Sequence, residues 1–71
     1  MNIYLQLAPA DIDFLTRIFE AMDGIGVVST VDARAGLIKL LVTEHTENEA
    51  RTMLRHFPRP FTYIIGDAVG P

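Results

Sequence analysis

Hydrophobic positions recur with two different periods in the first third of the chain. Residues 2–8 alternate apolar with other side chains, and this period of two predicts a β-strand. Residues 9–22 repeat apolar side chains every three or four positions, which predicts an amphipathic helix. Its apolar stripe consists of Ile12, Leu15, Ile18, Phe19 and Met22, with Phe14 at its edge. We expect Pro9 in the first turn, where its missing N–H is no loss, and Gly24 at the C′ position.

Two further strands and a tight connection are predicted in the middle of the chain. Residues 27–31 are rich in β-branched side chains and predict a second strand. Residues 32–36 predict a hairpin loop, because Asp32 favours the first turn position and Gly36 supplies the positive φ that closes it. Residues 37–43 carry apolar side chains on both faces. We therefore expect this third strand at the centre of the sheet.

The last third of the chain predicts a helix and one more strand. Residues 46–49, Thr-Glu-Asn-Glu, match the capping box, in which a hydroxyl and a carboxylate each bond a backbone N–H at a helix start. The helix that follows has the apolar stripe Ala50, Met53, Leu54 and Phe57. Pro58 and Pro60 end this helix. Residues 61–65 predict a short last strand, and residues 66–71 a loose tail.

The predicted order of elements is therefore β-α-β-β-α-β over a single domain, residues 1–71. Short strands with two helices on one face are typical of a two-layer α+β sandwich. Right-handed β-α-β crossovers place the first and third strands in the middle of a four-stranded antiparallel sheet. The sequence thus predicts the ferredoxin-like fold.

One face of this sheet is expected to carry no helix. The side chains of the two central strands that point to it are Tyr4, Gln6, Leu37, Lys39 and Leu41. On the flanking strands a one-residue slip would exchange the faces, and the candidates there are Val28, Thr30 and Tyr63. Several of these side chains are apolar, and a contiguous apolar patch on a small domain indicates a partner. We expect a second copy of the chain, because closed homodimers are the commonest soluble oligomers.

Composition narrows the functional classes. A chain of 71 residues buries a modest fraction of its surface, and without cysteine it has neither a disulfide nor a thiolate metal site to stabilise it. Self-association is the remaining way to stabilise such a small fold, and the apolar content of 49% is suited to it. The net charge of −3 argues against a general nucleic-acid binder. With neither a signal-peptide pattern nor the run of about 20 apolar residues of a membrane helix, we expect a cytoplasmic protein without membrane contact.

Candidate catalytic and metal-binding residues are few. His45 and His56 stand apart in the sequence, beside Glu44 and residues 47–49, and their spacing is not that of a zinc site. Ser29 is the only serine, and it lies on a predicted strand without a nucleophile elbow. We therefore expect neither an enzyme nor a bound metal or cofactor.

Two nucleic-acid or nucleotide signals are also weak. RNA binding on a sheet face needs aromatic side chains on the central strands with basic residues nearby, whereas Tyr4 and Lys39 are all that those strands offer. The stretch Gly24-Ile25-Gly26 follows a predicted helix, whereas the dinucleotide fingerprint follows a strand. A small basic cluster surrounds the second helix and is typical of a solvated face: Arg51, Arg55, His56 and Arg59.

Two stretches, LAPADIDFL and GIGVVSTVDARAGLIKLLV, together with the total length, connect the chain to a known family. The chain resembles an ACT-type regulatory domain, and more closely a group of short stand-alone bacterial proteins of unknown function with an ACT-like arrangement. The resemblance implies a module that pairs and senses amino acids. It places the ligand beside the loop after the first strand and against the start of a partner's second strand. The corresponding residues here are Ala8, Pro9, Ala10, Asp11, Gly24, Ile25, Gly26 and Val27.

The charge of the first loop indicates how an amino acid would bind there. Asp11 and Asp13 repel a carboxylate and suit an ammonium group. Acylphosphatases share this fold but use an arginine in the first loop, and residues 8–11 contain none. The expected function is a small regulatory domain that binds an amino acid or other small ligand at a homodimer interface. The alternative is a structural or protein-interaction module without a small ligand, which would use the apolar sheet face on another protein.

Overall fold

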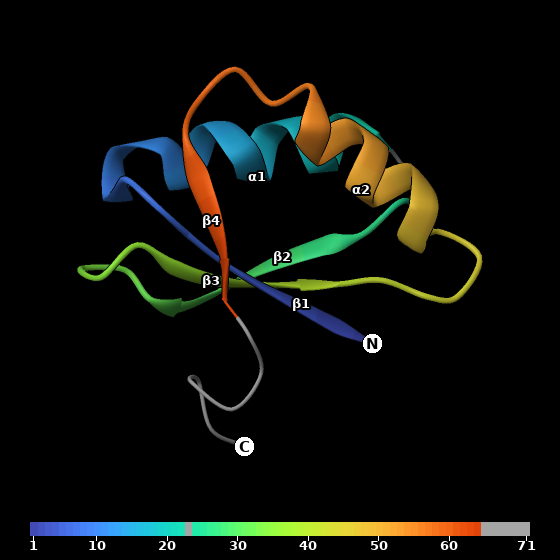
Figure 1. Ribbon diagram of the computed structural model, residues 1–71, viewed down its shortest axis with the longest axis horizontal. Coiled ribbons are helices and arrows are strands. Elements are labelled where there is room, and N and C mark those ends of the chain that lie inside the picture. The colour runs from blue at the N-terminus through green and yellow to red at the C-terminus, as the bar shows by residue number, and fades with distance from the viewer. Residues whose placement is uncertain (23, 65–71) are drawn as a thin grey trace.

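The chain folds into one antiparallel sheet of four strands, and two helices cover one of its faces (Figure 1). The computed structural model describes residues 1–22 and 24–64. The elements are β1 (Asn2–Leu7), a 3-10 turn (Pro9–Asp11), α1 (Ile12–Ala21), β2 (Val27–Asp32), β3 (Leu37–Leu41), α2 (Glu47–Arg55) and β4 (Phe61–Ile64). The predicted order β-α-β-β-α-β and the α+β ferredoxin-like fold are confirmed. The expected strand end at Ile65 and the tail 66–71 lie outside the described residues.

The two central strands are β1 and β3, as the crossover rule predicts. The strands follow one another in the order β2-β3-β1-β4, and every neighbouring pair is antiparallel. Beyond the end of β3, Met1 and Val42 exchange two further backbone bonds, from Val42 N–H to Met1 O (2.9 Å) and from the Met1 amine to Val42 O (2.7 Å). The edge strand β2 is irregular, with a register shift between Thr30 and Asp32.

The core lies between the sheet and the helices. Five leucine and isoleucine side chains are fully buried there: Leu5, Leu15, Ile38, Leu40 and Leu54. Burying a side chain of this size contributes about 1.5–3 kcal/mol to the stability of the fold. The rest of the core comes from the predicted stripes and strands, including Ile3, Leu7, Phe19, Ile25, Val42, Ala50 and Phe57. Both predicted helix stripes thus face the sheet, except that Met22 is 38% exposed at the end of α1.

Within the described residues, no helix lies on the opposite face of the sheet (Figure 1). Alternation along β1 and β3 places Tyr4, Gln6, Leu37, Lys39 and Leu41 on it, as predicted, because their neighbours Ile3, Leu5, Leu7, Ile38 and Leu40 are buried under the helices. We call this surface the open face.

The flanking strands have the register opposite to the one considered in the sequence. Val28 pairs with Leu40, Thr30 with Ile38, and Tyr63 with Leu5, and residues paired across a sheet share a face. Because these partners are core residues, the proposed placement of Val28, Thr30 and Tyr63 on the open face is wrong. The same register brings other side chains of the flanking strands to the open face: Val27, Ser29, Thr62 and Ile64.

The hairpin between β2 and β3 has the predicted chemistry. Asp32 Oδ1 accepts the backbone N–H groups of Arg34 (3.1 Å) and Ala35 (3.2 Å). Gly36 closes the loop with φ of +71° and donates its N–H to Ala33 O at 3.2 Å. An aspartate that bonds the backbone two and three residues ahead stabilises a turn, so the loop is defined locally.

The bounds of helix α1 differ from the range 9–22 that the hydrophobic period predicts. Pro9–Asp11 form a separate 3-10 turn, and the α-helix begins at Ile12. The C-cap residue is Met22, so Gly24 lies one position beyond the C′ position predicted for it. Gly24 nevertheless has φ of +82°, the left-handed conformation that glycine adopts without strain.

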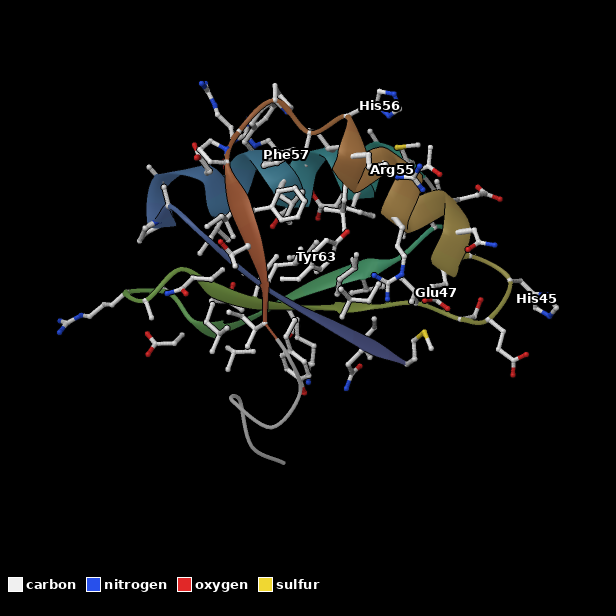
Figure 2. The ribbon with its side chains drawn as sticks, viewed as in Figure 1. His45, Glu47, Arg55, His56, Phe57 and Tyr63 are labelled. Atoms are coloured by element: carbon white, nitrogen blue, oxygen red, sulfur yellow. The ribbon has the colours of Figure 1, made fainter. Side chains whose placement is uncertain are left out.

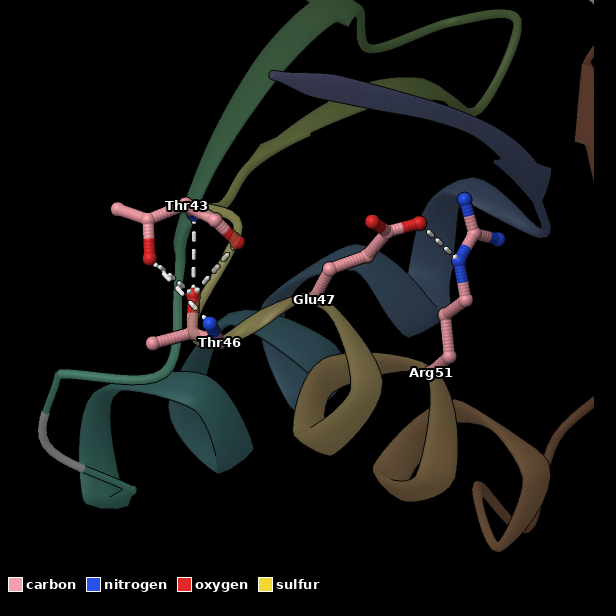
Figure 3. Close-up of polar contacts among 4 residues, drawn as sticks. All are labelled: Thr43, Thr46, Glu47 and Arg51. Atoms are coloured by element: carbon pink, nitrogen blue, oxygen red, sulfur yellow. Dashed lines mark hydrogen bonds and ion pairs between the residues drawn. The ribbon is translucent and has the colours of Figure 1, made fainter.

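Helix α2 begins without the predicted capping box. The Thr46 side chain bonds none of the first N–H groups of the helix. Its Oγ1 accepts the N–H of Thr43 at 3.0 Å, and Thr43 Oγ1 accepts the N–H of Thr46 at 3.2 Å (Figure 3). Glu47 bonds forward to Arg51 instead, at 2.8 Å. The capping-box prediction is wrong because the turn before α2 uses the hydroxyl that the motif assigns to the helix.

A row of aromatic rings connects the helices to the edge strand β4. Phe14 lies against Phe57 with ring centroids 5.5 Å apart, Phe57 against Phe61 at 6.3 Å, and Phe61 against Tyr63 at 5.4 Å. Figure 2 shows Phe57 and Tyr63 on the side of the domain where β4 runs. The Phe61–Tyr63 pair is edge-to-face and the other two pairs are tilted; an edge-to-face aromatic pair adds about 0.5–1.5 kcal/mol beyond its buried area. Phe14 thus packs against Phe57 although it is 39% exposed, in agreement with its position at the edge of the α1 stripe.

Candidate functional site

A cavity of about 440 Å³ opens where β2 begins. It lies between the second half of α1, the start of β2 and the segment that joins β3 to α2. The lining residues are Thr16, Phe19, Glu20, Gly24, Ile25, Gly26, Val27, Val28, Leu41, Val42, Thr43 and Thr46. The second half of the predicted ligand residues, 24–27, is therefore part of a cavity, which we call the β2 cavity.

The two glycines of this cavity have different roles. A Cβ at Gly24 would meet no atom within 4 Å, so its positive φ is what requires glycine there. A Cβ at Gly26 would lie 3.0 Å from Leu40 Cδ1 and 3.1 Å from Leu41 O. Gly26 thus lets the start of β2 approach β3 closely. Gly24 and Gly26 therefore serve the turn between α1 and β2, as one interpretation of the sequence predicts, and they also form part of the cavity wall.

Three threonines and one carboxylate supply the polar side chains of the β2 cavity. Thr16 Oγ1 donates to Ile12 O at 2.8 Å, within α1. The hydroxyls of Thr43 and Thr46 lie 3.2 Å apart and bond each other's backbone N–H groups (Figure 3). Among the described lining residues, Glu20 is the one that carries a charge, and it is exposed. The remaining walls are apolar.

The first half of the predicted ligand residues lies elsewhere. Ala8, Pro9 and Ala10 are exposed, and Asp11 donates its N–H to Ala8 O at 2.8 Å within the 3-10 turn. The Asp11 carboxylate faces Arg59 Nε at 3.7 Å, so a cation already accompanies the charge that the sequence assigned to a ligand amine. This loop lines neither the β2 cavity nor two further cavities beside α2 and β4.

The two halves of the predicted site are at opposite ends of the sheet. Leu7, at the end of β1, pairs with Phe61, whereas Val27 pairs with Leu41 at the end of the sheet where β1 begins. A pocket that joins residues 8–11 with residues 24–27 inside one chain is therefore excluded. The shared site implied by the resemblance requires the first loop of a second copy.

A second cavity, of about 490 Å³, lies between the end of α1 and the outer side of α2. Its lining is Met22, Ile25, Asn48, Glu49, Thr52, Met53 and His56. The sequence contained a partial signal for it, because Met22 ends the apolar stripe of α1 and Met53 belongs to that of α2. His56 is held at its rim, with Nδ1 2.9 Å from Thr52 O.

A third cavity, of about 290 Å³, lies beside β1 and β4 and includes Arg51. The Arg51 guanidinium bonds Glu47 at 2.8 Å and lies 5.7 Å from the centre of the Tyr63 ring. The hydrogen bond that Arg51 donates to Glu47 raises the pKa of Arg51 above its already high value, against the lesser effect of burial. Because Glu47 neutralises this cation, the cavity offers little to an anion.

Histidines and carboxylates do not converge in the described part of the chain. Within residues 1–22 and 24–64, no group of three or more His, Cys, Asp or Glu side chains is placed to hold a metal ion. Figure 2 shows His45 and His56 on separate segments, both pointing away from the domain. Among the same residues, no helix is long and apolar enough to cross a bilayer.

Comparison with known proteins yields one match. A family model described as "Domain of unknown function (DUF4911)" matches residues 5–60, from the second half of β1 to the residue before β4. No curated protein matches the chain, and no solved structure matches it.

Proposed function

Since the chain belongs to the DUF4911 family, whose function is unknown, we propose that it is a small regulatory domain that binds an amino acid or another small ligand. The β2 cavity is the observation that carries the proposal. Its volume of about 440 Å³ falls in the range of small-molecule pockets, which combine apolar walls with a few polar groups. The resemblance to ACT-type domains points to the same residues, 24–27.

The proposal includes a homodimer. The open face presents Val27, 64% exposed, and Leu41, 41% exposed, beside Tyr4 and Leu37. Lys39 is the one charged side chain of the two central strands on this face. A small chain with a limited core gains stability from covering such a surface. The second copy would also be the source of a first loop for the β2 cavity, since the loop of the same chain lies at the far end of the sheet.

Thermal unfolding at several protein concentrations, with and without each amino acid, tests the proposal. A ligand that binds only the folded form raises the unfolding midpoint by mass action, and the midpoint of a dimer rises with protein concentration. We expect both effects. A midpoint that is unchanged by every amino acid and small metabolite tried would contradict ligand binding.

A matched pair of variants assigns any shift to the cavity. Val27 and Val31 are both exposed valines of β2, but only Val27 lines the cavity. Val27→Trp should obstruct the cavity and reduce the ligand shift, whereas Val31→Trp should leave it. Equal shifts in the two variants would place the ligand elsewhere.

The alternative function is a protein-interaction module without a small ligand. The apolar open face favours it independently of the cavity, because contiguous exposed apolar patches mark interaction sites. A stoichiometric heterologous complex, lost in an open-face variant and retained in Val31→Trp, would support this alternative over the sensor.

A further inference from the structure

The charge around the β2 cavity restricts which ligands it can take. Within residues 1–22 and 24–64, Glu20 is the single charged residue of the lining. It stands in the last turn of α1 (Ile12–Ala21), a turn that contains no basic residue. The carbonyl end of a helix carries a partial negative charge, which disfavours an acidic side chain there and favours a cation. Both features make this wall of the cavity electronegative.

The charges nearest to Glu20 along α1 do not compensate it. Arg17, one turn earlier, directs Nε to Asp13 at 3.0 Å, away from the end of the helix. Among the described residues, the ion pairs of the chain join Asp13, Glu47 and Asp11 to their arginines, and none involves Glu20. The Glu20 carboxylate is therefore available to a ligand.

The hydroxyls of the lining offer acceptors more than donors. A hydroxyl has one hydrogen and two lone pairs. The hydrogen of Thr16 is used in its bond to Ile12 O. Thr43 and Thr46 each accept the other's backbone N–H, and one of the two hydroxyl hydrogens fills the 3.2 Å contact between them. A carboxylate requires donors, whereas an ammonium group brings its own three donors.

The apolar part of the lining adds a second requirement. Phe19 and Ile25 are buried core residues that form part of the wall, and Val28 is partly buried beside them. A ligand that fills the cavity must cover these side chains with apolar groups, because hydrophobic contact is gained only where water is removed from both surfaces.

From these features we infer that the β2 cavity binds a primary ammonium compound with an aliphatic body and no carboxylate, with the ammonium at Glu20. This inference rests on the proposed function, and it narrows the ligand from amino acids to aliphatic amines. The Asp11 loop is not needed for it. Glu20 of the same chain binds the ammonium group, the role that the sequence assigned to Asp11.

Three probes with the same branched 3-methylbutyl body test the inference. They are 3-methylbutylamine, leucine and 4-methylpentanoate, which carry an ammonium group only, both groups, and a carboxylate only. Unfolding midpoints and isothermal titration at matched ionic strength should rank their affinities in that order. Glu20→Gln should weaken the amine about tenfold or more, the size of effect expected for one charge-assisted bond. The control Glu44→Gln removes an exposed carboxylate outside the cavity and should leave the affinity unchanged.

The outcomes separate this inference from the proposed function. Tighter binding of leucine than of the amine, or any comparable binding of 4-methylpentanoate, would overturn the amine inference while leaving a ligand-binding domain. Amine binding that survives Glu20→Gln would also overturn it. If neither these probes nor any amino acid binds, both the amine inference and the proposed ligand-binding function are contradicted. Folding of the Glu20→Gln variant is verified by its own unfolding midpoint without ligand, and the surface position of Glu20 makes a large change there unexpected.

Discussion

Leu7 and Gly36 are in direct backbone contact at one end of the sheet. The Leu7 N–H donates to Gly36 O at 3.0 Å, and a Cβ built on Gly36 would overlap the Leu7 carbonyl oxygen. The loop from β2 to β3 thus lies against the end of β1, with Gly36 at a positive φ of +71°. The hairpin turn and the central strand β1 are therefore positioned by one another.

This contact predicts a difference between two glycines that share a left-handed backbone. Gly36→Ala should lower the free energy of unfolding by at least about 2 kcal/mol, because strain and backbone overlap add. Gly24→Ala should cost only the conformational strain, about 1–2 kcal/mol, since its Cβ meets open space. Urea unfolding at constant protein concentration measures both values. Equal losses would show that the overlap at Leu7 relaxes without cost.

Neighbouring leucines of β3 lie on opposite faces of the sheet. Leu40 is fully buried and Leu41 is 41% exposed. Leu40→Ala should cost about 2–5 kcal/mol, a large share of the roughly 4–10 kcal/mol expected for a domain of this size. Leu41→Ala should cost about 1 kcal/mol or less. Similar losses for the two variants, measured by urea unfolding, would contradict the register of β3.

The start of α2 distinguishes the observed turn from the predicted capping box. Thr46→Ala removes the bond to the Thr43 N–H and should cost about 1 kcal/mol, which Thr46→Ser should restore. Glu49→Ala should change stability by no more than about 0.5 kcal/mol, the helix-dipole contribution of an exposed acid. A loss for Glu49→Ala as large as that for Thr46→Ala would mean that the capping box does form in solution.

The open face yields a prediction about association. Leu37→Lys places a second ammonium group beside Lys39, on the same face of β3, and should weaken a dimer that buries this face. Thr52→Lys adds the same charge on the exposed side of α2 and should leave association unchanged. Sedimentation equilibrium measures both variants. A dimer with unaltered affinity in Leu37→Lys would assign the interface to another surface.

The faces on which the side chains of β2 and β4 lie could not be predicted from the sequence. Ser29 and Thr30 have similar polarity, as do Thr62 and Tyr63, so alternation gave no preferred face for either strand. The face is decided by pairing: Thr30 lies opposite Ile38 and Tyr63 opposite Leu5, both buried. In β1 the apolar Ile3, Leu5 and Leu7 alternate with Tyr4 and Gln6, and in β3 the charged Lys39 lies on the face away from the helices, so in these strands the predicted face was right.

The sequence likewise indicated only part of the candidate site. Residues 24–27 line a cavity, because a helix end and a strand start meet there, and their binding of a ligand stays a prediction. Residues 8–11 were not brought to it, and Asp11 instead accompanies Arg59, a residue distant in sequence. The place of Glu20 in the cavity wall was not predicted, since in the sequence it is one more polar position on the outer side of an amphipathic helix.

The sequence by itself determined the elements, their order and the fold. Those depend on periods of two and about 3.6 residues and on turn residues such as Asp32 and Gly36, all of which act over a few neighbouring positions. The tertiary structure alone decided the faces of the edge strands, the separation of the two halves of the predicted site, and the cavity beside Glu20. These depend on contacts between residues far apart in the chain, whose free energy comes from packing and pairing across the sheet and leaves no local pattern.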